Sequence, residues 1–370
     1  MKHLDKYRGC LIGGAAGDAL GYAVEFLTED AIFCKYGKNG ITEYDLIDGT
    51  ARISDDTQMT LFTANGLLLG TTRGMMRGIM AAYPDYIALC YKDWLRTQYE
   101  HFSPDQKASC SWLMNVPELF SSRAPGNTCL SAIHASLNGA AGTIEKPINS
   151  SKGCGGVMRV APIGLYLGKK KLSSEEIDRI GAQAAALTHG HELGYIPAAA
   201  LVHIIHCITH RDMVLSDAVN DAIAAMENLF PRAKHLRQFL AIMERAVRLS
   251  QADMDDLDAI HQIGEGWVAE ETLAIAVYCA LKYEHDFDRA LIAAVNHSGD
   301  SDSTGAVTGN ILGAYLGLSK IPQKYKDNLE LYDVILAIAD DLYNDCKISE
   351  YSPYSDEMWE QKYVYGTYRP

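Results

Sequence analysis

Residues 5–22 have the sequence Asp-Lys-Tyr-Arg-Gly-Cys-Leu-Ile-Gly-Gly-Ala-Ala-Gly-Asp-Ala-Leu-Gly-Tyr. Small residues recur through this stretch, at Gly9, Gly13, Gly14, Ala15, Ala16, Gly17 and Gly21. Their spacing predicts a buried helix, because glycine and alanine leave room for a neighbouring backbone to approach closely.

Apolar residues at intervals of three and four predict further helices along most of the chain. We expect them at 57–70, 78–97, 173–187, 192–209, 234–250, 270–284, 286–297, 303–317 and 328–344. Strand signals are weak, with one short stretch of mixed polarity at residues 40–48. No repeat, low-complexity segment or long linker divides the sequence. The pattern therefore predicts an all-α protein with a single domain over residues 1–370.

The composition is that of a globular protein, since 48% of the 370 residues are hydrophobic and 22% are charged. A formal net charge of −14, without a local run of lysine and arginine, argues against a nucleic-acid binder. We see no uncharged stretch of ~18 apolar residues for a membrane span, and no signal peptide at the start. Nine cysteines without a CxxC pair indicate neither a disulfide framework nor a zinc site, and favour the cytoplasm.

Three loops rich in turn-forming residues interrupt the helices, at 121–128, 147–157 and 296–305. Glycine-dense loops that open helices expose backbone N–H groups, which can hold phosphate oxygens. Each loop taken alone also fits an ordinary turn. An acidic protein that handles an anionic substrate needs local positive charge, and metal ions or helix N-termini would supply it.

Two acidic clusters stand at the start of expected helices: Ser54-Asp55-Asp56-Thr57 and Asp300-Ser301-Asp302-Ser303-Thr304. One interpretation is helix capping, because Ser and Asp are favoured N-caps and acids in a first turn complement the helix dipole. The other is that these oxygens bind hard divalent cations such as Mg²⁺ or Mn²⁺. Four carboxylates gathered without counter-charge would repel one another, so this second interpretation predicts one shared two-metal site.

Five ordered motifs then resemble the ADP-ribosylglycohydrolase family. They are Gly17-Asp18-Ala19-Leu20-Gly21-Tyr22-Ala23-Val24-Glu25-Phe26, Ser54-Asp55-Asp56-Thr57-Gln58-Met59, Gly153-Cys154-Gly155-Gly156-Val157-Met158-Arg159, Thr188-His189 and Gly299-Asp300-Ser301-Asp302-Ser303-Thr304-Gly305. The resemblance spans residues 8–317 and leaves 345–370 as a C-terminal segment. It implies a large orthogonal bundle of many helices, with a dinuclear magnesium or manganese centre in a central cleft.

The resemblance also implies roles for particular residues. The implied metal ligands are Ser54, Asp55, Asp56, Asp300, Asp302 and Ser303. Glu25 is implied as the acid near the reacting centre, and Asp302 as a ligand that also joins the proton transfer. The implied substrate-binding residues, on glycine-rich loops and beside the ribose, are Gly126, Asn127, Thr128, Ser151, Gly153, Gly155, Met158 and His189.

Two features depart from the family pattern. Several relatives carry Asn where this chain has Cys154, which puts a ribose contact from that side chain in question. The segment 71–122, which contains Trp94 and Trp112, matches least and is a candidate for selecting the leaving group. The remaining histidines of the helix expected at 192–209 and its flanks are interpreted as structural; they are His191, His203, His206 and His210. The pair His206 and His210 has the spacing of a zinc helix, but no intervening Glu or third ligand is evident.

The implied reaction is hydrolysis of the bond between C1 of the distal ribose and an acceptor side chain, through an oxocarbenium-like transition state. We expect a hydrolase that uses two divalent cations, Mg²⁺ first and Mn²⁺ as the alternative, and that releases ADP-ribose from ADP-ribosylated proteins, with modified arginine as the acceptor. Two alternatives remain open. One is a hydrolase of a free ADP-ribosyl small-molecule conjugate, and the other is an immunity protein that binds and neutralises a cognate ADP-ribosyltransferase, with the tail 351–370 as a docking segment.

Overall fold

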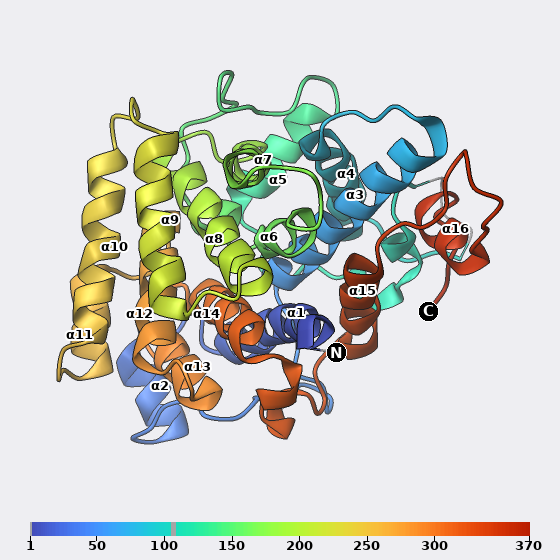
Figure 1. Cartoon of the computed structure of the whole chain (residues 1–370). Helices are drawn as coiled ribbons and strands as arrows, with labels where there is room; N and C mark the ends of the chain where they lie inside the picture. Colours follow the sequence, from blue (N-terminus) through green and yellow to red (C-terminus); the bar gives the residue numbers. More distant parts are fainter. Residues whose placement is uncertain (1, 105–108) are drawn as a thin grey trace.

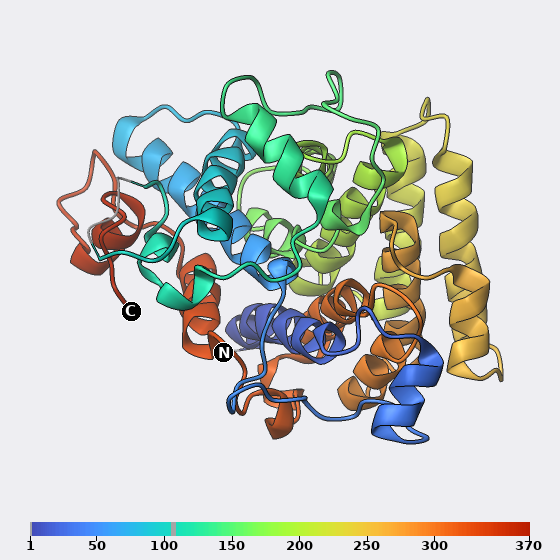
Figure 2. The ribbon, with the colours of Figure 1, turned by 180° about the vertical axis from the view of Figure 1, so that it is seen from behind.

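The computed structural model describes residues 2–104 and 109–370. Within these ranges the chain forms sixteen α-helices: α1 Lys2–Tyr22, α2 Glu29–Tyr36, α3 Asp55–Arg77, α4 Tyr83–Tyr99, α5 Asn127–Ser136, α6 Ala161–Leu167, α7 Ser174–Ala186, α8 Glu192–His210, α9 Leu215–Leu229, α10 Leu236–Ser250, α11 Asp256–Ile263, α12 Ala269–Lys282, α13 Phe287–Val295, α14 Ser301–Leu316, α15 Tyr332–Asn344 and α16 Glu357–Tyr363. Short 3₁₀ helices are η1 Trp112–Asn115, η2 Pro117–Leu119, η3 Cys154–Gly156, η4 Leu318–Lys320 and η5 Gln323–Tyr325. Figures 1 and 2 show α9 and α10 standing upright at one side, while α1 runs across the centre.

The all-α class is confirmed, and each predicted helix is present with shifted ends. The largest shift is at 57–70, where the helix runs on to Arg77, and the helix expected at 78–97 begins only at Tyr83. Gly78 adopts a left-handed φ of 66°, donates its N–H to the carbonyl oxygen of Gly74, and so ends α3.

The weak strand signal at 40–48 is wrong: in the described ranges the β pairing consists of isolated bridges, one of them between Ile47 and Thr50. The helices not predicted are α2, α5, α6, α9, α11 and α16.

Helices α1 and α14 pack backbone to backbone at the centre of the molecule (Figures 1 and 2). An ideal Cβ built on Gly13 would lie 2.4 Å from the carbonyl oxygen of Gly309, and one on Gly17 would lie 1.9 Å from that of Gly305. Gly9 meets Gly313 in the same way. The close approach predicted from residues 5–22 is therefore confirmed, and its partner is a second glycine repeat in α14.

The register of this pairing is antiparallel and places the two acidic segments near one another. Gly9 faces Gly313, Gly17 faces Gly305, and an ideal Cβ on Gly21 would lie 2.1 Å from the carbonyl oxygen of Ser301. The carboxyl end of α1, just before Glu25, therefore lies against the amino end of α14, which follows Asp300. No side chain separates the two backbones, so this position is fixed by main-chain contact.

Helix α8 lies in the core. By length and composition alone it could cross a membrane, but 94% of its most apolar window is buried in the structure. It is covered by α6, α7, α9 and α12. Burial on all sides explains why it is apolar around its whole circumference.

Residues 71–122, the segment expected to select the leaving group, contribute both to the core and to the surface. Trp94 and Trp112 are fully buried, and the Trp94 indole N–H donates to Gln58 at 3.1 Å. Residues 105–108 of this segment lie outside the described residues. The C-terminal segment packs beside it: the Trp359 indole N–H donates to Thr72 at 2.9 Å, while Tyr351 is 86% exposed. Neither tryptophan is placed to meet a leaving group.

Candidate metal and ligand site

Asp18 of α1 organises the start of α3. Its carboxylate accepts the backbone N–H groups of Ser54 at 2.9 Å and Thr57 at 3.0 Å, and the Thr57 hydroxyl at 2.5 Å. Ser54 caps the helix by accepting the N–H of Asp56 at 3.2 Å. Because the cap is supplied by Ser54, the carboxylates of Asp55 and Asp56 remain available to the cavity beside them.

The second acidic cluster has the same arrangement at the start of α14. Asp300 is the N-cap residue and accepts the N–H of Ser303. The Ser303 hydroxyl donates to Asp56 at 2.9 Å, a direct link between the two clusters. One residue of each cluster therefore caps its helix, as the first interpretation predicts, and the two clusters meet; that they bind metal stays a prediction.

Glu25 joins this group from the loop that follows α1. One carboxylate oxygen of Glu25, one of Asp300 and one of Asp302 all lie within 4.8 Å of one another. Glu25 Oε2 is buried and has no hydrogen-bond partner. Glu25 is also the most exposed of the five carboxylates, at 7%, so it lies nearest the opening.

Burial and mutual repulsion oppose the simultaneous ionisation of the carboxylates in this cluster. Burial, and after it the neighbouring Asp302, raises the pKa of Asp55, Asp56 and Asp300 well above their usual range. The same two causes, burial first, raise the pKa of Glu25 to about 10. Burial and Asp302 also raise the pKa of Asp18 to about 7. Only bound cations or bound protons can neutralise such a group of carboxylates.

The donor set fits hard divalent cations. It consists of carboxylate and hydroxyl oxygens, the ligands that Mg²⁺ and Mn²⁺ prefer. The orphaned Glu25 Oε2 offers a further oxygen that nothing in the described chain satisfies. Ser54 does not line the cavity itself, but its side chain hydrogen-bonds Asp302. The ligand roles of all six predicted residues remain predictions.

A cavity of about 190 Å³ adjoins the carboxylates. Its lining includes all the predicted site residues except Ser54 and Ser151: Glu25, Asp55, Asp56, Gly126, Asn127, Thr128, Gly153, Gly155, Met158, His189, Asp300, Asp302 and Ser303. Ser151 lies behind the wall, where its hydroxyl is 3.3 Å from that of Thr128 and accepts the N–H of Gly153. Drug-sized ligands usually occupy about 300 to 1,000 Å³, so this cavity encloses only part of a nucleotide-sized ligand.

Two glycine-rich segments also line the cavity, next to the acids. Gly126 precedes α5, whose first turn has no side-chain cap, so its N–H groups face the cavity without a competing acceptor. The Gly126 N–H also hydrogen-bonds Asp55. In the other segment, a Cβ on Gly155 would lie 2.8 Å from Cys129 Sγ and 3.0 Å from the ring of His189. Gly155 therefore permits a close approach that a side chain would block.

His189 contacts the second segment as a neutral ring. Burial, and after it the guanidinium of Arg159, lowers the pKa of His189 to about 3. Thr188 Oγ1 lies 2.6 Å from Arg159 Nη2, which donates to it, and 2.8 Å from His189 Nδ1. The Thr188 hydroxyl has two acceptors within reach, the Ala185 carbonyl oxygen at 3.5 Å and His189 Nδ1 at 2.8 Å, and donation to the nearer one, Nδ1, places the ring proton on Nε2. His189 thus offers one neutral N–H donor beside Gly153.

Four residues that the sequence did not assign complete the site. Asp18 and Arg159 stand in two of the quoted motifs but received no role, and the structure shows what each one positions. Trp267 lines the cavity and stacks on Phe26, with ring centroids 6.3 Å apart. The Cys154 thiol hydrogen-bonds Asp300 and so contacts the acidic cluster. Trp267 lies far from every motif in sequence and had no local signal.

Known proteins resemble the chain over nearly its full length. A sequence model of the ADP-ribosylglycohydrolase family matches residues 1–350. Human ADP-ribosylhydrolase ARH3 is 23% identical over 364 residues, which cover 92% of this chain and 94% of that protein. ADP-ribosylarginine hydrolase Tri1 of Pseudomonas putida is 24% identical over 347 residues, with 92% and 78% covered. A solved structure of an ADP-ribosylglycohydrolase-related protein complex has a TM-score of 0.62 at 24% identity, over 93% of this chain and 98% of that one, and shows the same fold.

Proposed function

Since the chain belongs to the ADP-ribosylglycohydrolase family of hydrolases, we propose that it releases ADP-ribose from ADP-ribosylated proteins, with modified arginine as the acceptor. The observation that carries this proposal is one cavity lined by five carboxylates and two glycine-rich segments. Acids and backbone N–H donors that line one cavity suit a ligand that joins a reacting sugar to phosphates.

Arginine as the acceptor has two supports. One is the similarity to the Pseudomonas putida protein, whose name states that it hydrolyses ADP-ribosylarginine. The other is charge, because an arginine-linked acceptor carries a cationic guanidinium. Glu25 lies nearest the opening of the cavity, and its carboxylate would face that cation as it leaves.

We further propose that the acidic cluster holds two divalent cations, Mg²⁺ first and Mn²⁺ as the alternative. The ligands would be Ser54, Asp55, Asp56, Asp300, Asp302 and Ser303. When bound, such cations orient the ribose hydroxyls and lower the pKa of water beside them. Glu25 Oε2, without a partner in the chain, is the atom from which a proton would be given or taken at the scissile bond.

The glycine-rich segments and His189 bind the remainder of the ligand in this proposal. The free N–H groups at the start of α5 would hold phosphate oxygens. His189 Nε2 would donate to a ribose hydroxyl, and Gly153 and Gly155 leave the space for it. The small cavity volume means that the adenosine end extends beyond the enclosed part, towards Trp267 and Phe26.

The test is an ADP-ribose release assay on arginine-linked and serine-linked proteins and on free ADP-ribosyl conjugates, with Mg²⁺, with Mn²⁺ and with a chelator. We expect turnover on the arginine-linked protein that the chelator abolishes. Glu25→Gln should lower kcat by about 10²- to 10⁴-fold, the usual contribution of a general acid or base, and leave cation binding in place. Asp302→Asn should lose cation affinity as well as turnover.

Asp253→Asn is the matched control, because Asp253 is exposed and outside the site; its turnover should equal that of the wild type. If the enzyme turned over free ADP-ribosyl conjugates but no ADP-ribosylated protein, its substrate would be a small molecule and not a protein. Turnover that survives both the chelator and Asp302→Asn would refute the metal-dependent hydrolase.

A further inference from the structure

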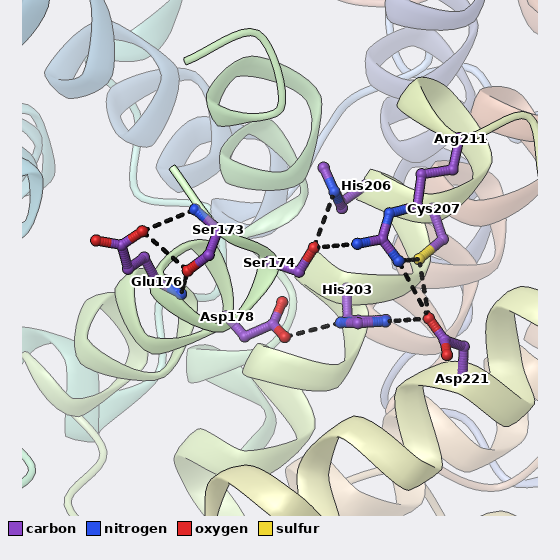
Figure 3. Close-up of polar contacts among 9 residues, drawn as sticks. All are labelled: Ser173, Ser174, Glu176, Asp178, His203, His206, Cys207, Arg211 and Asp221. Atoms are coloured by element: carbon purple, nitrogen blue, oxygen red, sulfur yellow. Dashed lines mark hydrogen bonds and ion pairs between the residues drawn. The ribbon is translucent and has the colours of Figure 1, made fainter. Parts of the chain in front are cut away.

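A second cluster of ligand-type side chains lies on the side of α8 (Figure 3), and none of its residues lines the cavity. His203 and Cys207 stand one helical turn apart on α8, so they share a face. Asp221 of α9 reaches the same point: its Oδ2 lies 3.0 Å from His203 Nε2 and 3.6 Å from Cys207 Sγ. His203 lies roughly 16 Å along α8 from its first residue.

We propose that His203, Cys207 and Asp221 form a zinc site that joins α8 to α9. This site was not predicted from the sequence, because the third ligand comes from α9, a helix that was not predicted, and the pair on α8 lacks the usual metalloprotease pattern. The proposal is independent of the hydrolase function.

The distances match tetrahedral zinc. Zinc binds histidine nitrogen and carboxylate oxygen at about 2.0 to 2.2 Å and cysteine sulfur at about 2.3 Å, which separates tetrahedral ligand atoms by about 3.3 Å for N and O, and about 3.6 Å for S and O. The observed separations are 3.0 Å and 3.6 Å. All three ligand atoms lie within 4.8 Å of one another. A mixed N, S, O set also favours zinc over magnesium or calcium.

Asp178 of α7 supplies the supporting contact that zinc-binding histidines normally have. Its Oδ2 accepts from His203 Nδ1 at 2.7 Å, and both side chains are buried. This bond fixes the ring so that Nε2 points at Asp221 (Figure 3). A carboxylate on the second nitrogen orients a histidine ligand and raises its basicity.

Arg211 occupies the open side of the cluster. Its Nη1 lies 3.4 Å from Asp221 Oδ2, and its Nη2 donates to Ser174 at 2.5 Å. The side chains of Arg211 and Asp221 are 45% and 43% exposed, so the guanidinium can move into solvent and open an entry path. Zinc would then take over the positive charge that Arg211 supplies to Asp221, with water as a fourth ligand.

The nearby pair His206 and His210 stays outside this site, whereas His203, interpreted from the sequence as structural with them, becomes a ligand in this proposal. His206 Nε2 lies 3.3 Å from the Ser174 hydroxyl, and His210 Nε2 donates to the Leu165 carbonyl oxygen at 2.7 Å. The ligand set therefore has one histidine and one thiol, which gives the metal complex a distinctive spectrum.

The test is a Co²⁺ titration of the full chain after chelator treatment, because Co²⁺ replaces zinc and absorbs in the near ultraviolet when a thiolate binds it. The protein used carries Cys154→Ser, so that the thiol beside Asp300 cannot contribute. We expect one thiolate band with the intensity of one Co²⁺–thiolate bond per chain, whatever further Co²⁺ the carboxylates of the acidic cluster bind, and we expect Zn²⁺ to displace it. Cys207→Ser, added to this protein, should abolish the band.

Two variants separate a metal site from a structural cluster. Cys34→Ser is the matched control, since Cys34 is exposed, and should leave the band unchanged. Asp178→Asn should keep the band and weaken Co²⁺ binding by about 10- to 100-fold, as supporting carboxylates usually do. At saturating Mg²⁺, which occupies the acidic cluster, Zn²⁺ should raise the melting temperature more with Cys207 present than with Cys207→Ser, whose folding is checked by circular dichroism. Absence of the thiolate band, or its survival in Cys207→Ser, would overturn the proposal.

Discussion

His189 owes its chemistry to two neighbours that do not themselves line the cavity. Arg159 is fully buried and lies 4.5 Å from the Tyr91 ring centroid, so its charge is held in place. It donates to Thr188, and Thr188 faces His189 Nδ1. Burial first, and then this cation two hydrogen bonds away, keep the imidazole neutral by lowering the pKa of His189.

This chain of contacts predicts how ligand binding depends on pH. Because burial and Arg159 lower the pKa of His189 to about 3, the ring stays neutral from pH 5 to 8, and ADP-ribose affinity should show no histidine step near the usual 6.5. His189→Ala removes one buried hydrogen bond and should weaken binding by about 1–3 kcal/mol. Calorimetric titration with ADP-ribose across this pH range measures both effects.

The control for this experiment is His134→Ala, an exposed histidine of α5, whose affinity should match the wild type. If ADP-ribose affinity changed near pH 6.5 in the wild type but not in His189→Ala, the His189 ring would be protonated within the working pH range, which would contradict this prediction. His189→Gln should restore part of the affinity, since the amide N–H can replace the ring N–H.

Among single residues, the sequence patterns indicated those with reactive side chains but not the residues that position them. Asp55, Asp56 and Asp302 were recognisable because paired acids near Ser have few structural explanations. Asp18 was overlooked because a single acid inside a helix usually faces solvent; here it accepts three hydrogen bonds from the start of α3. Trp267 could not be found, since it reaches the cavity only through the pairing of Gly153 with Val268.

Among the helices, α1 and α14 together position the acidic cluster. Their glycines let the backbones touch, and the antiparallel register sets where the loop of Glu25 lies relative to Asp300 and Asp302. The acidic cluster is thus assembled by glycine positions outside the cavity. Substitutions at these glycines should act on the site through the helix spacing.

Gly17→Ala is the direct test of this packing. A Cβ there would lie 1.9 Å from the Gly305 carbonyl oxygen, a backbone atom that cannot rotate away. We expect a loss of unfolding free energy of about 3 kcal/mol, at the upper end for overpacking, together with weaker cation binding. Chemical denaturation and a Mg²⁺ or Mn²⁺ titration measure the two effects.

Gly139→Ala serves as the comparison, because a Cβ at that glycine would lie 3.5 Å from the nearest atom, an ordinary contact. Its stability should change by no more than about 0.5 kcal/mol, as at most surface positions. If Gly17→Ala were equally mild, the helices could separate without cost and the packing would not determine the site.

Predicting the elements from sequence succeeded where apolar spacing was long and regular. α6 was missed for a physical reason: it has seven residues, begins with Ala-Pro and is buried throughout, so it shows no polar face. α9 is different, because its buried residues Leu215, Ala218, Val219, Ala222 and Met226 do recur at helical spacing. That signal was present in the sequence and was overlooked.

Over the whole molecule, the net charge of −14 and the buried acidic cluster have a joint consequence for stability. A carboxyl group whose pKa is higher in the folded protein than in the unfolded chain binds its proton more tightly when folded. Burial and neighbouring acids raise the pKa of Asp18 to about 7 and of Glu25 to about 10. The stabilisation is complete below about pH 4, the unfolded value, and is lost as the pH rises through the folded values.

The metal-free protein should therefore become less stable from pH 5 to pH 8, and divalent cations should offset that loss by replacing the missing protons. We expect Mg²⁺ or Mn²⁺ at about 100 times its dissociation constant to raise the melting temperature by roughly 5 °C at pH 8, and by clearly less at pH 5, where protons already neutralise the acids. Scanning calorimetry at both pH values, with and without chelator, measures this difference. The combined change Asp300→Asn and Asp302→Asn removes two of the acids, so both the pH-dependent loss and the gain from cations should shrink together. A cation effect equal at both pH values, or unchanged in that variant, would mean that the cations bind elsewhere than this cluster.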